Sequence, residues 1–210
     1  MHDFPQSDRL YFPATARNCR PITDALSLIL PRKGSVLEIA SGSGEHIIAF
    51  QRSFPELIWQ ASDFNLDHCK SINAWICYAN LFPQMPYALQ LNVLDEEWVM
   101  PSFVQSQLMV ILSINLIHIA PWSCCKSLVS HSAEYLPVGG RLIFYGPFRM
   151  LGQHVSDSNL IFDQSLRQRN SLWGVRDLES VEQLCMNVGL VEMKVINLPS
   201  NNFFVSFIKR

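Results

Sequence analysis

The order of apolar runs along the chain is the feature that most constrains its fold. Five short apolar runs alternate with segments that have helical spacing. Short apolar runs bounded by turn residues are typical of buried strands, and a helix between two strands allows them to lie parallel. The alternation therefore predicts an α/β fold, with a mostly parallel sheet, right-handed crossovers and helices on both faces. The expected strands are Ser35–Ala40, Leu57–Ser62, Tyr87–Val93, Leu108–Ile114 and Arg141–Gly146.

The segments between these runs predict the helices. Pro21 suits the first turn of a helix that extends to Leu30, and Asn65 suits the cap of the helix before the third strand. Two more helices are expected, one through residues 47–54 and one from Pro121 to Leu136.

The chain ends differently from the way it begins. A helix that is stopped by Gly189 precedes two strand-like runs, Leu190–Leu198 and Phe203–Lys209. The four residues between these runs leave no room for a helix, so the two strands should pair antiparallel. Seven strands that end in such a hairpin are typical of Rossmann-like methyltransferases, which is an analogy at the level of the fold.

The segment Pro147–Arg176 breaks the tight alternation. Loops of this length are uncommon unless they are functional, and this one follows the fifth strand at the edge where ligands bind in such sheets. We expect it to carry a short amphipathic helix and to act as a lid.

Composition limits the class of protein. The 210 residues fit a single domain over residues 1–210, and 49% apolar against 16% charged residues argue against disorder. A net charge of −2 without a Lys/Arg run gives no sign of a nucleic-acid or membrane partner. No apolar stretch is long enough for a bilayer, and no signal peptide is recognisable, so we expect a cytoplasmic location. The six cysteines contain no C-x-x-C pair and are interpreted as buried thiols, with no metal site.

The glycine loop after the first strand indicates a cofactor. Glu38 lies on the strand, and Gly42 and Gly44 allow a tight turn and a close approach of the backbone to a ligand. Asp63 ends the second strand, where its two carboxylate oxygens can accept hydrogen bonds from both ribose hydroxyls. S-adenosylmethionine (SAM) needs partners for its carboxylate, ammonium, ribose and adenine. The other residues expected to contact it from the loop and the strand ends are Ala40, Ser41, Ser43, His46, Phe64, Asn92, Val93, Ser113 and Asn115.

A dinucleotide is the rival cofactor. Its G-x-G-x-x-G fingerprint uses the third glycine for close helix–strand packing, and Ile47 stands at that position. The acidic Glu38 upstream of the glycines also suits SAM better, so SAM is preferred to NAD.

Five blocks of sequence carry a family resemblance, namely residues 14–18, 38–46, 117–122, 145–148 and 173–178. They resemble the methyltransferase-like protein 26 family, a group of uncharacterised class I SAM-dependent methyltransferase-like proteins, and the resemblance covers nearly the whole chain. It implies a Rossmann-like class I fold, SAM as cofactor, S-adenosylhomocysteine (SAH) as product, and lid contacts from Arg17 and Asn18, but it names no substrate. One departure is Asn92, where the family usually has an acidic residue.

Three residues are candidates for chemistry at the methyl acceptor. His118 follows the fourth strand, Tyr145 ends the fifth, and His154 lies in the long insertion. Imidazole titrates near neutrality, so either histidine can serve as a general base. We expect a small-molecule acceptor held by these residues and the insertion. Two alternatives remain open, a non-catalytic module that binds SAM or SAH and an NAD(P)-dependent oxidoreductase. The sequence predicts no oligomeric state.

Overall fold

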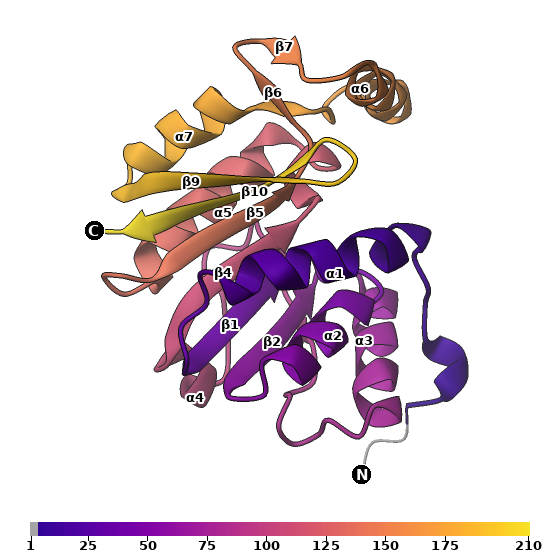
Figure 1. Ribbon diagram of the computed structural model, residues 1–210. Helices are drawn as coiled ribbons and strands as arrows, with labels where there is room; N and C mark the ends of the chain where they lie inside the picture. Colours follow the sequence, from indigo (N-terminus) through magenta and orange to yellow (C-terminus); the bar gives the residue numbers. More distant parts are fainter. Residues whose placement is uncertain (1–3) are drawn as a thin grey trace. The chain divides into compact units, whose positions relative to one another are not determined.

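The computed structural model describes residues 4–210, which form two compact units (Figure 1). Unit 1 is Met1–Leu112, described from residue 4, and unit 2 is Ser113–Arg210. The main sheet has seven strands in the order β3-β2-β1-β4-β5-β10-β9, and a small sheet has the order β7-β6-β8. The predicted α/β fold, with a mostly parallel seven-stranded sheet and a C-terminal antiparallel hairpin, is confirmed.

Unit 1 contains three long helices and the first strands. Its elements are η1 (Gln6–Asp8), α1 (Pro13–Ser27), β1 (Gly34–Ile39), α2 (Glu45–Ser53), β2 (Leu57–Asp63), α3 (Leu66–Tyr78), β3 (Leu89–Gln90), α4 (Ser102–Gln105) and β4 (Leu108–Ile114), which continues two residues into unit 2.

Strands β1 and β2 are parallel and almost completely buried. Their register pairs Gly34 with Leu57 and Ile39 with Ser62. Apart from the half-buried Ile58, the apolar side chains of both strands lie in the core, as continuous apolar runs in parallel strands should. The predicted first, second and fourth strands are confirmed, the first ending one residue earlier, at Ile39, because Ala40 has a φ of 61°.

The first helix begins earlier than predicted. The sequence pattern placed Pro21 in the first turn, whereas α1 starts at Pro13 and contains Pro21 in its interior. Pro13 occupies the first turn instead, where a missing N–H costs nothing. The prediction was wrong because Pro21 was taken as a start signal, although the apolar face formed by Ile22, Ala25 and Leu26 continues from the buried Thr15.

The third strand is shorter than predicted. Only Leu89–Gln90 pairs with β2, in parallel. On each side of these two residues, a backbone N–H donates to a side chain. Ala88 N donates to Asn73 Oδ1 at 2.8 Å, and Asn92 N donates to Asp95 Oδ2 at 3.1 Å. Such side-chain bonds compete with a strand ladder.

Unit 2 contains the closing strands and the insertion. Its elements are η2 (Leu116–His118), α5 (Trp122–Tyr135), β5 (Arg141–Gly146), β6 (Phe148–Met150), β7 (Gln153–His154), α6 (Asp157–Arg169), β8 (Arg176–Asp177), α7 (Leu178–Met186), β9 (Leu190–Leu198) and β10 (Asn202–Lys209). Strand β10 pairs antiparallel with both β5 and β9, so the predicted terminal hairpin is confirmed.

The segment 147–176 is more ordered than a loop. It holds β6, β7 and the 13-residue helix α6, and its last residue begins β8. Strand β6 pairs antiparallel with β7 and parallel with β8, which makes the small sheet. The predicted helix is present, but the short strands on either side were missed because two- and three-residue strands have no readable alternation.

The six cysteines are free thiols, and four of them are buried. No helix in the part of the chain that the structure describes is long and apolar enough to span a membrane.

Candidate functional site

The carboxyl ends of β1 and β2 bring the predicted loop and the predicted acid together. Asp63 ends β2 and is 2% exposed. Its Oδ2 accepts a hydrogen bond from the Gly42 backbone N–H at 2.9 Å. The carboxylate therefore lies against the glycine loop, which is the geometry that the sequence argument required.

The same carboxylate has two more neighbours. Asp63 Oδ1 accepts from Asn65 N at 3.0 Å, and His68 Nδ1 lies 3.1 Å from Oδ2. Asn65 is the predicted cap of α3, and its own side chain accepts from Asp67 N at 2.8 Å. A carboxylate has about four lone-pair sites, so Asp63 still has capacity for a ligand hydroxyl.

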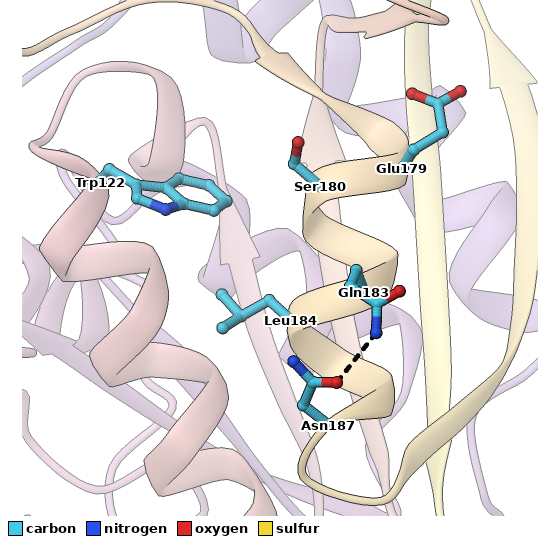
Figure 2. Close-up of a pocket in the computed structure, with 6 residues that line it drawn as sticks. All are labelled: Trp122, Glu179, Ser180, Gln183, Leu184 and Asn187. Atoms are coloured by element: carbon cyan, nitrogen blue, oxygen red, sulfur yellow. Dashed lines mark hydrogen bonds between the residues drawn. The ribbon is translucent and has the colours of Figure 1, made fainter.

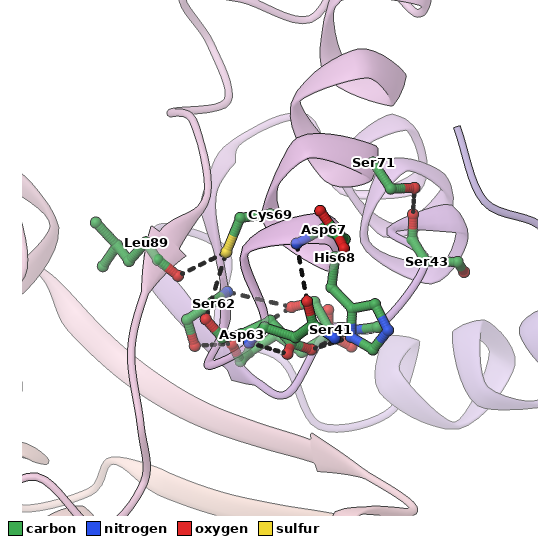
Figure 3. Close-up of polar contacts among 12 residues, drawn as sticks. Ser41, Ser43, Ser62, Asp63, Asp67, His68, Cys69, Ser71 and Leu89 are labelled. Atoms are coloured by element: carbon green, nitrogen blue, oxygen red, sulfur yellow. Dashed lines mark hydrogen bonds and ion pairs between the residues drawn. The ribbon is translucent and has the colours of Figure 1, made fainter. Parts of the chain in front are cut away.

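Serines tie the loop to β2 and α3. Ser41 N donates to Ser62 O at 2.9 Å, and Ser62 Oγ donates to the Glu38 carbonyl at 2.7 Å. On the other side of the loop, Ser71 Oγ donates to Ser43 O at 2.7 Å. These bonds fix the loop on both flanks before any ligand arrives (Figure 3).

Both loop glycines have left-handed backbone conformations. Gly42 has a φ of 59° and Gly44, the N-cap of α2, has a φ of 93°. A Cβ on Gly44 would lie 2.9 Å from the Cα of Ile72 in α3. Glycine at this position is thus required both by the turn and by the close packing of α3.

Glu38 is a buried carboxyl on β1 beneath the loop. It is 1% exposed, and within residues 4–210 its Oε2 has no hydrogen-bond partner. Burial raises the pKa of Glu38 to about 7, and the nearby Asp63 charge adds to this effect. A buried oxygen without a partner at a ligand loop can accept a hydrogen bond from a cationic ligand group.

Arg17 and Asn18 lie differently from the prediction. They were expected before the first helix, but both lie within α1, and Arg17 is exposed. His46 lies in the first turn of α2, and its Nε2 is 2.7 Å from Asn18 Oδ1. Burial lowers the pKa of His46 to about 4. The neutral ring therefore donates to Asn18, which links α2 to α1.

In the turn after β3, polar side chains accept hydrogen bonds from backbone N–H groups of the same turn. Asn92 is exposed, and its Oδ1 accepts from Leu94 N at 3.1 Å. Asn92 is one of the residues that the sequence argument expected to contact SAM. The acidic side chain at this turn is Asp95, which accepts from Asn92 N and which the sequence argument missed. Val93 is buried, while Phe64, directly after Asp63, is 66% exposed and free to face a ligand.

In unit 2, the residues after β4 form a tight turn against Gly146. Asn115 has a φ of 61°, and its N–H donates to Tyr145 O at 2.8 Å. The ring of His118 packs so closely on Gly146 that a Cβ there would lie 2.5 Å from its Nε2. Ser113 Oγ is buried and has no hydrogen-bond partner among the described residues.

The geometry argues against His118 as a base. His118 is 1% exposed, and burial, with the charge of Arg176, lowers its pKa to about 3. Across residues 4–210 neither ring nitrogen has a hydrogen-bond partner. Tyr145 is also buried, at 2% exposed. Neither side chain is accessible to an acceptor in this conformation.

His154 is the better candidate, and a carboxylate lies beside it. The His154 Nε2 lies 3.4 Å from Asp163 Oδ2, which also accepts from Arg167 Nε at 2.9 Å. Asp163 Oδ1 accepts from Val175 N at 2.6 Å. Burial alone would raise the pKa of Asp163, but the Arg167 and Val175 donors outweigh it and lower that pKa. Gly174 allows this packing, since a Cβ there would lie 2.7 Å from both Asp163 and Arg167.

A surface groove of about 480 Å³ lies elsewhere in unit 2, beside α7 (Figure 2). Three of its polar side chains have partners in the chain: Gln183 Nε2 donates to Asn187 Oδ1, and Glu179 accepts from Leu151 N. None of the predicted site residues lines it, so we assign it no part in the chemistry. Its lining residues are Trp122, Glu179, Ser180, Gln183, Leu184 and Asn187.

Sequence reasoning assigned no site role to four residues, namely His68, Asp95, Asp163 and Phe12, whose Cε2 lies 3.2 Å from the place that a Gly42 Cβ would occupy. Asp163 and Arg167 carried a readable signal, since opposite charges four residues apart on a helix predict a pair. The other three are placed by turns and packing that no local pattern encodes. Within residues 4–210, no group of three or more His, Cys, Asp or Glu side chains is arranged to hold a metal ion.

Comparison with known sequences identifies the family. Residues 9–209 match the sequence profile of the family described as "Protein of unknown function (DUF938)". The chain belongs to this family. The match covers both the glycine loop of the DUF938 chain and its insertion, so both features lie within the family's domain.

Solved structures show what the fold of this DUF938 member is similar to. An O-methyltransferase family protein from Burkholderia thailandensis has a TM-score of 0.75 at 15% identity, covering 93% of this chain and 57% of that one. An O-methyltransferase family 2 protein from Planctomyces limnophilus, in complex with apigenin, has a TM-score of 0.72 at 17% identity, covering 98% and 64%. Human N-acetylserotonin methyltransferase, in complex with SAM, has a TM-score of 0.73 at 11% identity, covering 93% and 52%.

These likenesses establish the Rossmann-like methyltransferase fold of the DUF938 chain. It spans a little more than half the length of the solved structures it matches.

Proposed function

We propose that this chain is a SAM-dependent methyltransferase that acts on a small-molecule acceptor. The observation that carries the proposal is the bond between the Asp63 carboxylate and the Gly42 amide. It places a carboxylate that can accept hydrogen bonds from a ribose diol at the end of the second strand. This carboxylate lies against the glycine loop at the end of the first strand. This arrangement suits a nucleoside with an attached amino acid.

Each group of the cofactor has a partner on the chain. Asp63 would accept hydrogen bonds from the ribose hydroxyls, and the left-handed loop at Gly42 would admit the methionine portion. Glu38 has a free buried oxygen that would accept from the ammonium group, whose positive charge favours the ionised carboxyl. Ser113 and Asn115 remain expected partners of the amino acid portion, and Phe64 of the adenine face.

The comparisons support SAM as the cofactor. The human structure with this fold was solved in complex with SAM. The blocks that resemble methyltransferase-like protein 26 include the loop itself, residues 38–46. The missing third glycine at Ile47 disfavours NAD on independent grounds.

Methyl transfer needs placement more than activation. The SAM sulfonium is already a good leaving group, so the chain's own residues must position a nucleophile in line and exclude water. For a hydroxyl, thiol or amine acceptor a base takes up the proton. We assign this role to His154, because its Nε2 lies 3.4 Å from the Asp163 carboxylate, which can orient the ring.

One observation favours a second function. His118 and Tyr145, two of the three predicted catalytic residues, are buried. A protein that binds SAM or SAH without transferring a methyl group needs neither. This non-catalytic module shares the proposed cofactor site with the main proposal and differs only in the chemistry.

Isothermal titration with SAM, SAH and NAD tests the shared part. We expect binding of SAM and SAH but not NAD, and a Kd weakened roughly 10- to 100-fold in Asp63→Asn, because charge-assisted hydrogen bonds to the ribose are lost. Asp67→Asn is the matched control, since that carboxylate is exposed and pairs with Lys70 at 2.9 Å. Equal SAM affinity in Asp63→Asn and wild type would contradict the site.

A methyl-transfer assay separates the two functions. Purified protein with methyl-labelled SAM and a small-molecule fraction of cell extract should yield a labelled product, and His154→Ala should lower the rate without changing the Kd for SAM. Binding without product across such fractions supports the non-catalytic module instead.

A further inference from the structure

The residues before α1 form a strap that lies against the glycine loop. This strap, residues 9–12, is fixed to α3 and α2 through its backbone. Leu10 N donates to Ser71 Oγ at 2.8 Å, and Trp75 Nε1 donates to Leu10 O at 3.1 Å. At its end, Phe12 N donates to Glu45 Oε2 at 2.7 Å.

Side chains strengthen both ends of the strap. The Arg9 guanidinium lies 3.8 Å from the ring centroid of Tyr78, a cation–π contact on α3. Glu45 also accepts from Ser43 Oγ at 2.9 Å, so one carboxylate joins the strap to the glycine loop. The strap is thus linked through Glu45 to the glycine loop, and the Gly42 N–H of this loop donates to Asp63.

The ring of Phe12 lies against the two residues that contact Asp63 Oδ2. Its Cε2 is 3.2 Å from the place that a Gly42 Cβ would occupy. It meets the His68 ring edge-on, with centroids 5.7 Å apart. Gly42 N and His68 Nδ1 both approach Asp63 Oδ2, at 2.9 Å and 3.1 Å. The aromatic ring therefore borders the carboxylate that we assign to the ribose.

We propose that Phe12 is a ligand-contacting residue that forms one wall of the nucleoside site. Phe12 is 40% exposed, and a hydrogen bond holds its backbone. Its ring therefore offers apolar surface to a ligand, and the chain loses little conformational entropy on binding. A nucleoside held by Asp63 would cover this surface and shield its hydroxyl hydrogen bonds from water. The inference rests on the proposed cofactor and adds a recognition element from outside the loop and the strands.

The test compares Phe12→Ala with a matched variant on the strap. We expect Phe12→Ala to weaken the Kd for both SAH and adenosine roughly tenfold, because an apolar contact of this size is lost from the nucleoside. Tyr11→Ala is the control, since Tyr11 is 61% exposed and packs on Trp75 of α3 at 5.1 Å. It should leave both affinities within about twofold, a change that corresponds to well under 1 kcal/mol.

The outcomes separate this inference from the proposed function. If wild type binds neither SAH nor adenosine, the proposed function fails and this inference fails with it. If wild type binds both and Phe12→Ala binds them equally well or more tightly, only the wall is refuted.

A second variant does not depend on the stability of Phe12→Ala. In Phe12→Trp the new indole should change its fluorescence on SAH addition, measured as a difference against wild type. An unchanged difference spectrum at saturating SAH would also refute the wall.

Discussion

Gly44→Ala should destabilise the chain because two independent costs meet at one residue. Gly44 has a φ of 93°, a conformation that L side chains rarely adopt, and it caps α2 at the end of the cofactor loop. The added Cβ would lie 2.9 Å from Ile72 Cα, 3.0 Å from its Cγ1 and 3.3 Å from its Cβ. The nearest atom belongs to the backbone of α3, so a side-chain rotation cannot remove the clash.

The magnitude follows from these two costs. A left-handed conformation costs a non-glycine residue about 1–2 kcal/mol. Forcing an extra methyl group into a packed contact costs about 1–3 kcal/mol more. We therefore expect Gly44→Ala to lower the free energy of unfolding by about 2–5 kcal/mol, a large share of the roughly 5–15 kcal/mol typical of a folded domain.

Gly139→Ala supplies the matched control. Gly139 also has a positive φ, of 84°, but a Cβ there would meet nothing within 4 Å. This variant carries only the conformational cost, about 1–2 kcal/mol. Urea unfolding followed by circular dichroism and by tryptophan fluorescence measures both variants, and agreement of the two probes tests two-state behaviour.

The comparison between the two variants tests the steric argument. The difference between their free energies of unfolding isolates the Ile72 contact, because the backbone cost is common to both. If Gly44→Ala is no more destabilising than Gly139→Ala, the packing of the loop against α3 is not as close as described.

Three further predictions concern single side chains. The pKa of Glu38 is raised to about 7 in the folded chain, so the stability of wild type relative to Glu38→Gln should fall as pH rises from about 4.5 to 7, by on the order of 3 kcal/mol, in urea titrations at several pH values. Asn18→Ala should cost about 1–3 kcal/mol, read as a lower Tm at pH 7, because it leaves the buried His46 donor without its partner. Asp163→Ala should cost about 3–5 kcal/mol in urea unfolding, because it removes a buried carboxylate that accepts from Val175 N and from an arginine; a loss below 1 kcal/mol in either case would contradict the assigned bond.

Much of the sheet was predictable because its strands are read from local patterns. Strands β4 and β5 have the predicted limits, since continuous apolar runs mark strands buried on both faces. The hairpin followed from a four-residue gap that no helix can occupy. The third strand failed because its ends depend on side chains from elsewhere, such as Asn73, whose bond to Ala88 has no local signature.

The geometry around the glycine loop was more predictable than the surroundings of His118. Glycines and a strand-ending acid have fixed places in this fold, so Gly42 and Asp63 could be assigned from spacing alone. Burial is a tertiary property, and the sequence around His118 gave no sign that its ring would pack against Gly146. The strap was missed for the same reason, because Phe12 reaches Gly42 only through the turn of the chain into α1.

The bond from Gly42 to Asp63 has a consequence for the kinetics of recognition. The loop is held in its curved form by the folded chain itself, so its immobilisation is included in folding and not in complex formation. Association should then proceed without a slow rearrangement of the loop, and differences in affinity among adenosine analogues should arise from their dissociation rates. An analogue that lacks both ribose hydroxyls should therefore associate at a similar rate, because the loop is already in its bound form, but it should dissociate faster.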